Sequence, residues 1–144
     1  MWMFKPEPKL VAADQALSGR AEPILAPAPH AVLGTPITGP WKDGQRSILI
    51  ALGCFWGAEK VLWQLDGVWT TAAVYAGGWT PNPTYEEVCS GLTGHNEVVL
   101  VAYDPAVLPL EEVLKGNRPG YAVVDLKLGP ESGLVCVQTL HAHD

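Results

Sequence analysis

Residues 47–67 read SILIALGCFWGAEKVLWQLDG, and two different periodicities meet within this stretch. The run Ile48–Leu52 is short, continuous and apolar, which is typical of a buried strand. After Gly53, which permits a tight turn, apolar residues recur at helical spacing as far as Asp66-Gly67. The stretch therefore predicts a strand, a tight turn and a helix, with Cys54 at the helix start.

Cys54 occupies a position that favours reactivity. A side chain at a helix N-terminus faces backbone N–H groups that lack intrahelical partners and the positive end of the helix dipole. Both features favour the thiolate, which is the nucleophilic form of cysteine. A buried structural cysteine is the commoner situation for this residue type. Here the flanking glycines and the strand-to-helix junction favour a nucleophile.

The composition narrows the class of protein. A chain of 144 residues with 48% hydrophobic and 17% charged residues can form one domain with its own core. Its net charge of −6, without any cluster of Lys or Arg, argues against nucleic-acid binding. No apolar run approaches the roughly 18 residues of a membrane span. Three cysteines without close pairing are not typical of a disulfide framework, so we expect a cytoplasmic protein.

The pattern along the chain predicts three parts. Residues 1–46 hold seven of the 13 prolines, so an extended arm is expected there. Residues 47–115 alternate between strand-like and helical patterns, whereas residues 116–144 have only weak patterns. The strands expected in the middle part are 48–52, 68–75 and 97–103. This order predicts an α+β fold, a two-layer sandwich with helices on one face of a mixed sheet and the arm packed around it.

Two further side chains are candidates for a site. Glu97 opens the third predicted strand, where a carboxyl beside apolar residues loses solvation and can serve as a general acid. Tyr85 opens a short helix for which Thr84 and Glu87 form a predicted capping box, and its hydroxyl could donate a hydrogen bond into a site. Taken alone, a strand-end glutamate is more often solvated, and such a tyrosine is more often a packing residue.

We expect no metal site. The cysteines and histidines show neither C-x-x-C nor H-x-x-x-H spacing, and two of the histidines lie at the very end of the chain. His95 could act as a base for Cys54, as in thiol hydrolases, although no third orienting residue is obvious. A thiol hydrolase is therefore kept as an alternative function.

Four motifs follow one another in the middle part of the chain. They read GCFWG at residues 53–57, YAGG at 75–78, PTYEEVCSG at 83–91 and TGHNEVV at 93–99. In sequence, order and spacing they closely resemble the A-type methionine sulfoxide reductases, the peptide-methionine (S)-S-oxide reductases. The resemblance runs from about Ile50 to Lys115 and implies the ferredoxin-like core of that family.

The resemblance implies a role for each matched residue. Cys54 would attack the sulfoxide sulfur, Glu97 would protonate the sulfoxide oxygen and Tyr85 would help to hold that oxygen. Phe55 and Trp56 would form aromatic walls around the S-methyl group. The products would be methionine, free or within an oxidised protein, and a Cys54 sulfenic acid that a second thiol resolves. The resemblance implies no bound cofactor, with thioredoxin or another dithiol as the reductant.

The resemblance stops after Lys115. The family continues with a segment that supplies a second carboxylate and a second tyrosine, and later with recycling cysteines, whereas residues 116–144 look unrelated. Cys136, the one cysteine of this tail, is the candidate recycling thiol. We therefore expect a weak or inactive reductase with a rearranged C-terminus. A silent module that binds methionine sulfoxide or peptides is the alternative.

Overall fold

A computed structural model describes residues 10–114 and 121–123. Its helices and strands are β1 (Arg46–Ala51), α1 (Phe55–Leu62), β2 (Val68–Ala76), α2 (Tyr85–Cys89), β3 (Asn96–Tyr103), α3 (Leu110–Leu114) and β4 (Tyr121–Val123). The three strands expected between residues 47 and 115 lie within two residues of their predicted bounds. Cys136 lies outside the described residues, so its proposed recycling role stays a prediction.

The described chain forms two compact units. Unit 1 comprises residues 10–25 and 77–96 and carries α2, whereas unit 2 comprises residues 26–76, 97–114 and 121–123. The sheet and the helices α1 and α3 belong to unit 2. The proline-rich arm contributes to both units, since its residues up to Leu25 lie in unit 1 and those from Ala26 onward in unit 2. The predicted boundaries at residues 46 and 115 stay predictions.

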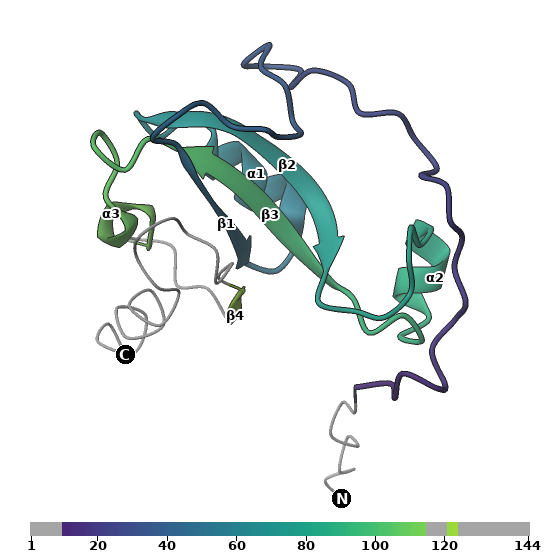
Figure 1. Cartoon of the computed structure of the whole chain (residues 1–144). Coiled ribbons are helices and arrows are strands. Elements are labelled where there is room, and N and C mark those ends of the chain that lie inside the picture. Colours follow the sequence, from purple (N-terminus) through teal and green to yellow (C-terminus); the bar gives the residue numbers. More distant parts are fainter. Residues whose placement is uncertain (1–9, 115–120, 124–144) are drawn as a thin grey trace, which may run out of the picture. The chain divides into compact units, whose positions relative to one another are not determined.

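The sheet has four strands in the order β2-β3-β1-β4 (Figure 1). Strand β1 pairs antiparallel with β3, placing Ile50 opposite Val99, and antiparallel with β4 on its other side. Strands β1 and β2 run in the same direction, and β3 lies between them in the opposite direction (Figure 1). The α+β class is thus confirmed, but the described sheet is antiparallel rather than mixed. The reason is topological: α1 joins two strands of the same direction, and β3 inserts between them.

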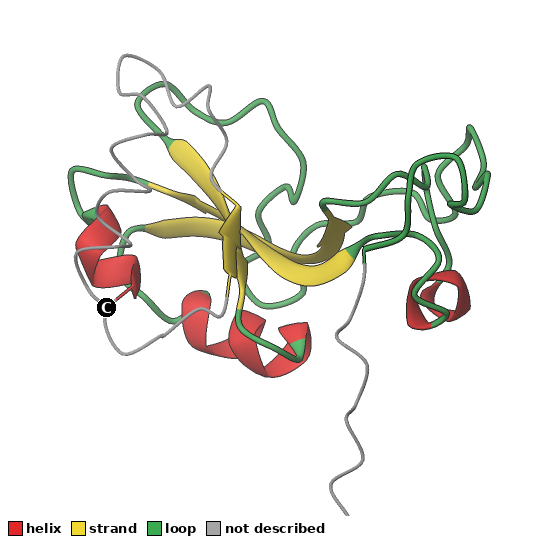
Figure 2. Cartoon of the chain, turned by 90° about the horizontal axis from the view of Figure 1, so that it is seen from below, coloured by secondary structure: helices red, strands yellow, loops and turns green. Residues whose placement is uncertain are grey.

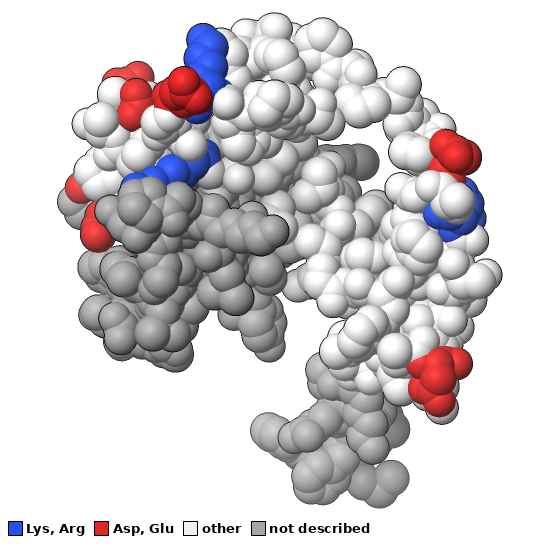
Figure 3. All heavy atoms as spheres, in the orientation of Figure 1, with Lys and Arg blue, Asp and Glu red and all other residues white. Residues whose placement is uncertain are grey.

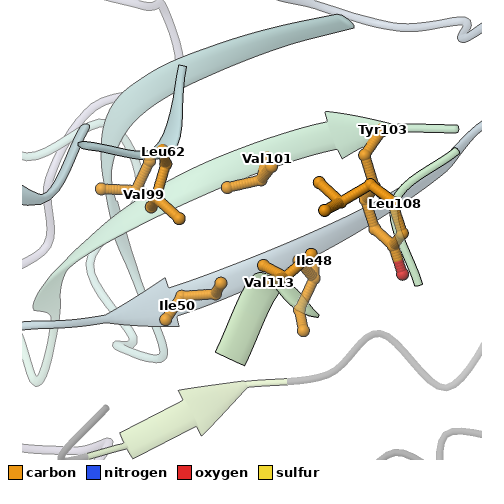
Figure 4. Close-up of a cluster of buried hydrophobic side chains, with 8 residues drawn as sticks. All are labelled: Ile48, Ile50, Leu62, Val99, Val101, Tyr103, Leu108 and Val113. Atoms are coloured by element: carbon orange, nitrogen blue, oxygen red, sulfur yellow. The ribbon is translucent and has the colours of Figure 1, made fainter. Parts of the chain in front are cut away.

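The core lies between one face of this sheet and two helices. Figure 2 shows α1 and α3 on the same side of the sheet. Alternate residues of β1 and β3 point to that side, as the period of a strand requires, and meet Leu62 of α1 and Val113 of α3. The buried cluster comprises Ile48, Ile50, Leu62, Val99, Val101, Tyr103, Leu108 and Val113 (Figure 4). Burial of these side chains fixes α1 against the sheet and so fixes the position of its N-terminus.

The turn from β1 into α1 follows the sequence-based expectation. Gly53 has a φ of 85°, a conformation that glycine adopts without steric cost. Cys54 is the N-cap residue, and Phe55 is the first residue of α1. Phe55 and Ala58 pack against the core cluster from the buried side of the helix. The strand, turn and helix predicted from residues 47–67 are confirmed.

The second half of the arm packs within unit 2 through a buried histidine. The Nδ1 atom of His30 accepts the backbone N–H groups of Val32 and Leu33, at 3.1 and 3.0 Å, so the ring proton resides on Nε2. Nε2 lies 2.9 Å from Oγ1 of Thr71, whose hydroxyl donates to Glu59 at 3.0 Å. Both ring nitrogens of His30 therefore have hydrogen-bond partners. The network connects the arm to Thr71 of β2 and Glu59 of α1.

Positive charge is not concentrated in one place on the described surface of either unit. Within each unit, the face shown in Figure 3 carries its described Lys and Arg side chains singly among acidic and uncharged residues. None of the described helices is long and apolar enough to cross a membrane.

Candidate active site

The carboxyl of Glu97 lies at the N-terminus of α1, beside the peptide group that follows Cys54. The backbone N–H of Phe55 donates a hydrogen bond to Oε2 of Glu97 over 3.2 Å. This N–H belongs to the peptide group that joins Cys54 to Phe55, so the carboxyl is anchored directly beside the candidate nucleophile. The register explains the contact: extending the pairing of β1 with β3 beyond Ile50 and Val99 brings Glu97 beside the turn that leads into α1.

The thiol of Cys54 is free and exposed. Its side chain makes no capping hydrogen bond, and the first turn of α1 contains no acidic residue. The thiol therefore lies at the N-terminal end of α1, where the Phe55 N–H bonds to Glu97 and the thiol itself caps no N–H group. Cys54 is thus accessible from solvent. The carboxyl of Glu97 beside it can donate or accept a proton.

Two aromatic residues flank this pair on α1. Phe55 packs partly into the core, and its ring meets that of Tyr75 with centroids 5.5 Å apart. Trp56 is 76% exposed, which leaves an aromatic surface beside Cys54 open to a ligand. Of the two aromatic residues predicted to contact the substrate, Phe55 is held by packing against the core, and Trp56 is exposed to solvent. Sequence reasoning did not single out Tyr75, although the YAGG motif that begins with it was a signal.

Tyr85 lies in unit 1, whereas the other four candidate residues lie in unit 2. It is the first residue of α2 and is 61% exposed. The predicted capping box is confirmed, because the Glu87 N–H donates to Oγ1 of Thr84 and the Thr84 N–H donates to Oε2 of Glu87. The start of α2 is therefore well defined within its own unit. The role of Tyr85 toward Cys54 stays a prediction.

His95 is a structural residue of unit 1. Its Nδ1 accepts the N–H of Gly78 at 3.1 Å, and its Nε2 lies 2.7 Å from the carbonyl oxygen of Thr80. The ring is consistent with one proton on Nε2 and an occupied acceptor at Nδ1. A Cβ on Gly78 would lie 2.4 Å from the His95 amide nitrogen, so this close approach requires glycine. Because both ring nitrogens serve the loop, the geometry does not favour His95 as a base in a thiol hydrolase.

The described residues contain no cluster of side chains that could hold a metal ion. No group of three or more His, Cys, Asp or Glu side chains within residues 10–114 and 121–123 is arranged to hold a metal ion. A pocket of ≈ 260 Å³ is lined by residues of the arm, α1 and β2, including His30, Glu59 and Trp63. Its lining includes no cysteine.

An ion pair between Arg20 and Glu87 holds helix α2, and its contribution to stability depends on pH. Hydrogen bonds from Arg20, together with the N–H of Thr84, hold the pKa of Glu87 below its ordinary value of 4.5. A lowered pKa in the folded chain means that the ionised carboxylate stabilises the fold above the unfolded-state pKa. That contribution is lost as the pH falls through the lowered pKa.

We therefore expect Glu87→Gln to be less stable than the wild type at pH 7, with a gap that closes as the pH falls below 4.5 toward the lowered pKa of Glu87. The gap should be small, because the pair is partly exposed and solvent screens it. Urea unfolding of both proteins at a series of pH values measures it. A gap that stays constant or widens in acid would contradict this assignment.

Comparisons with known proteins identify a family. The family model for peptide methionine sulfoxide reductase matches residues 46–117. The peptide methionine sulfoxide reductase MsrA of Corynebacterium glutamicum is 61% identical over 114 residues, which are 78% of this chain and 52% of that protein. The MsrA of Methylobacterium nodulans is 57% identical over 116 residues, covering 80% of this chain and 52% of that protein.

Among solved structures, methionine sulfoxide reductase A of Corynebacterium diphtheriae superposes with a TM-score of 0.80 at 34% identity. The match covers 94% of this chain and 72% of that one. The chain spans about half the length of the curated relatives that it matches.

Proposed function

Because the chain belongs to the peptide methionine sulfoxide reductase family, we propose that it reduces the S-epimer of methionine sulfoxide to methionine, with Cys54 as the nucleophile. The observation that carries this proposal is the hydrogen bond between the Phe55 N–H and the carboxyl of Glu97, beside an exposed thiol. A nucleophile and a proton donor for the oxygen are the two groups that this reduction needs first.

The chemistry assigns each group a step. The Cys54 thiolate attacks the sulfoxide sulfur, which gains two electrons and leaves as the thioether of methionine. The Cys54 sulfur loses two electrons and ends as a sulfenic acid that carries the oxygen. An unprotonated oxide leaves sulfur poorly, so Glu97 delivers a proton to it in the transition state. Since Oε2 accepts the Phe55 N–H, Oε1 is the atom that carries this proton.

Aromatic side chains would select the substrate. The exposed ring of Trp56 and the anchored ring of Phe55 offer apolar contact to the S-methyl group, and the hydroxyl of Tyr85 would bind the oxygen. The methyl group, the oxygen and the rest of the methionine side chain each need a separate contact around the sulfur. Such an arrangement accepts one configuration at the sulfur and rejects the other. Free methionine sulfoxide and oxidised proteins both present this group.

A complete cycle needs a reductant. The sulfenic acid condenses with a second thiol to give a disulfide and water, and a dithiol such as thioredoxin returns both sulfurs to thiols. This cycle uses no bound cofactor. It suits a reducing compartment such as the cytoplasm, where thiols are kept reduced.

A single-turnover experiment tests the proposal. The reduced chain, mixed with excess S-epimer and no added thiol, should form about one methionine for each Cys54, because the sulfenic acid cannot be recycled without a reductant. The R-epimer is the matched control and should give none. Binding of the S-epimer without methionine formation would favour the silent binding module. Release of product from a thioester or amide substrate instead would favour the hydrolase.

A further inference from the structure

A pocket in unit 2 is formed by residues other than those of the candidate active site. Its volume is ≈ 260 Å³, and it is lined by arm residues 28–32 and Ile37, by Glu59 and Trp63, and by residues 71–73 of β2. All of these residues belong to unit 2. The described lining does not include any of the four candidate active-site residues of this unit. A ligand in this pocket would therefore occupy a second site.

The pocket combines apolar walls with a few polar groups. Most of its lining is apolar, with side chains such as Ile37 and Trp63. Three polar side chains complete the lining, namely His30, Thr71 and Glu59. Small-molecule sites in proteins typically have this composition, in volumes of about 300–1,000 Å³. The pocket lies just below this range, so it suits a small ligand.

The three polar side chains form a chain of hydrogen bonds that ends on Glu59. Because Nδ1 of His30 accepts two backbone N–H groups, the ring donates from Nε2 to Oγ1 of Thr71 over 2.9 Å. The Thr71 hydroxyl then donates to Oε1 of Glu59 over 3.0 Å. Both donors are buried. The carboxyl of Glu59 is thus held in place before any ligand binds, which lowers the entropic cost of binding.

Glu59 brings a negative charge to this pocket without a full positive charge beside it. Its side chain is only 18% exposed, and the described basic group within ion-pair distance is His30, whose Nε2 lies 3.9 Å from Oε1. That ring holds one proton and is neutral, since its Nδ1 serves as an acceptor. A largely buried carboxylate without a cation is unfavourable, so a cation that enters the pocket would relieve this cost.

We propose that this pocket binds a primary alkylammonium ion, with the ammonium group donating to Oε2 of Glu59 and a short alkyl chain against Ile37 and Trp63. Within the described part of the chain, Oε2 accepts no hydrogen bond, so it is the oxygen open to a ligand. The site is independent of the reduction proposed for Cys54. Its occupant is identified by charge and size: one positive charge on a small apolar body.

The hydrogen bond already made by Oε1 favours this class of cation over others. A guanidinium binds a carboxylate best through a fork of two N–H bonds, one to each oxygen, and Oε1 already accepts the Thr71 hydroxyl. An ammonium is a compact point charge, for which a single oxygen suffices. A divalent metal ion needs several oxygen or nitrogen ligands, and the described residues contain no group of three acidic, His or Cys side chains that could supply them.

Titration of the purified chain with n-butylammonium chloride tests the proposal, with NaCl adjusted to keep the ionic strength constant. The amide NMR signals of residues 71–73 and the indole signal of Trp63 should shift in a saturable way. n-Butanol has a similar shape without the charge and should bind about 10- to 10²-fold more weakly, because a hydrogen bond to a charged group is lost. From ethylammonium to n-butylammonium, affinity should rise about fourfold for each added methylene.

A matched pair of variants isolates the carboxylate. Glu59→Gln keeps an oxygen that can accept the Thr71 hydroxyl and removes the charge, so affinity for n-butylammonium should fall by about 10-fold or more. Glu111→Gln makes the same change on the exposed surface of α3 and should bind as the wild type does. Wild-type positions of the amide signals outside the pocket show that each variant is folded.

Three results would each overturn the proposal: shifts that do not saturate or that lie outside the pocket, equal binding of n-butanol and n-butylammonium, or equal affinities in Glu59→Gln and Glu111→Gln. The first two use the wild type alone, so they decide the matter even if Glu59→Gln does not fold. A lysine with blocked termini carries the same ammonium on a peptide. Tighter binding of this lysine than of n-butylammonium assigns the pocket to a peptide side chain, and weaker binding assigns it to a free amine.

Discussion

Cys54→Ser is expected to abolish methionine formation from the S-epimer. Serine keeps the size of the side chain and the helix-capping position, but its hydroxyl is not ionised near neutrality and does not take up the sulfoxide oxygen as a sulfenic acid. Removing an enzyme's nucleophile lowers turnover by on the order of 10⁶-fold in the best-studied case. The measurement is the amount of methionine released in a single turnover, together with the mass of the chain, which should gain no oxygen.

The second exposed cysteine provides the matched control. Cys89 is the last residue of α2 and has a free thiol, so Cys89→Ser makes the same chemical change at another exposed helix end. We expect its single-turnover yield to match that of the wild type. If Cys89→Ser lost as much methionine yield as Cys54→Ser, the position of Cys54 at a helix N-terminus would not explain its reactivity.

The strand, turn and helix around Cys54 and the start of α2 were predictable from the sequence, because each depends on residues that are close together in the chain. The apolar run before Gly53 and the helical spacing after it identified β1, the turn and α1 to within two or three residues. Thr84 and Glu87 identified the start of α2 through a capping box whose two hydrogen bonds are both present. Each of these signals lies within one turn or one strand, where spacing alone determines contact.

Non-local features had no comparable signal. The insertion of β3 between β1 and β2 depends on which strands pair, and the period of a strand does not encode its neighbours. The Arg20–Glu87 pair joins residues 67 positions apart, and either residue alone reads as a solvated surface charge. Glu97 was identified as a candidate, but its bond to the Phe55 N–H follows only from the register of β1 with β3.

That bond makes Glu97→Gln an informative substitution. The glutamine side chain keeps a carbonyl oxygen that can accept the Phe55 N–H, so the start of α1 should stay in place. It has no acidic proton to give, and general acid catalysis contributes about 10²–10⁴-fold to such steps. We therefore expect the single-turnover rate to fall by that factor, while the concentration of substrate that gives half the maximal rate changes little, because proton transfer matters chiefly in the transition state.

Glu59→Gln is the control for this loss of charge. Glu59 lies on the same helix and accepts a hydrogen bond from Thr71, which a glutamine oxygen can also accept. Its removal of one negative charge from α1 should leave the rate near that of the wild type, whereas the same change at position 97 should not. Since the two variants share their change in charge and keep their acceptor, only the loss of the proton beside Cys54 distinguishes them. Equal rates for the two variants would remove Glu97 from the role of acid and leave the thiolate at the helix N-terminus to act with a proton from solvent.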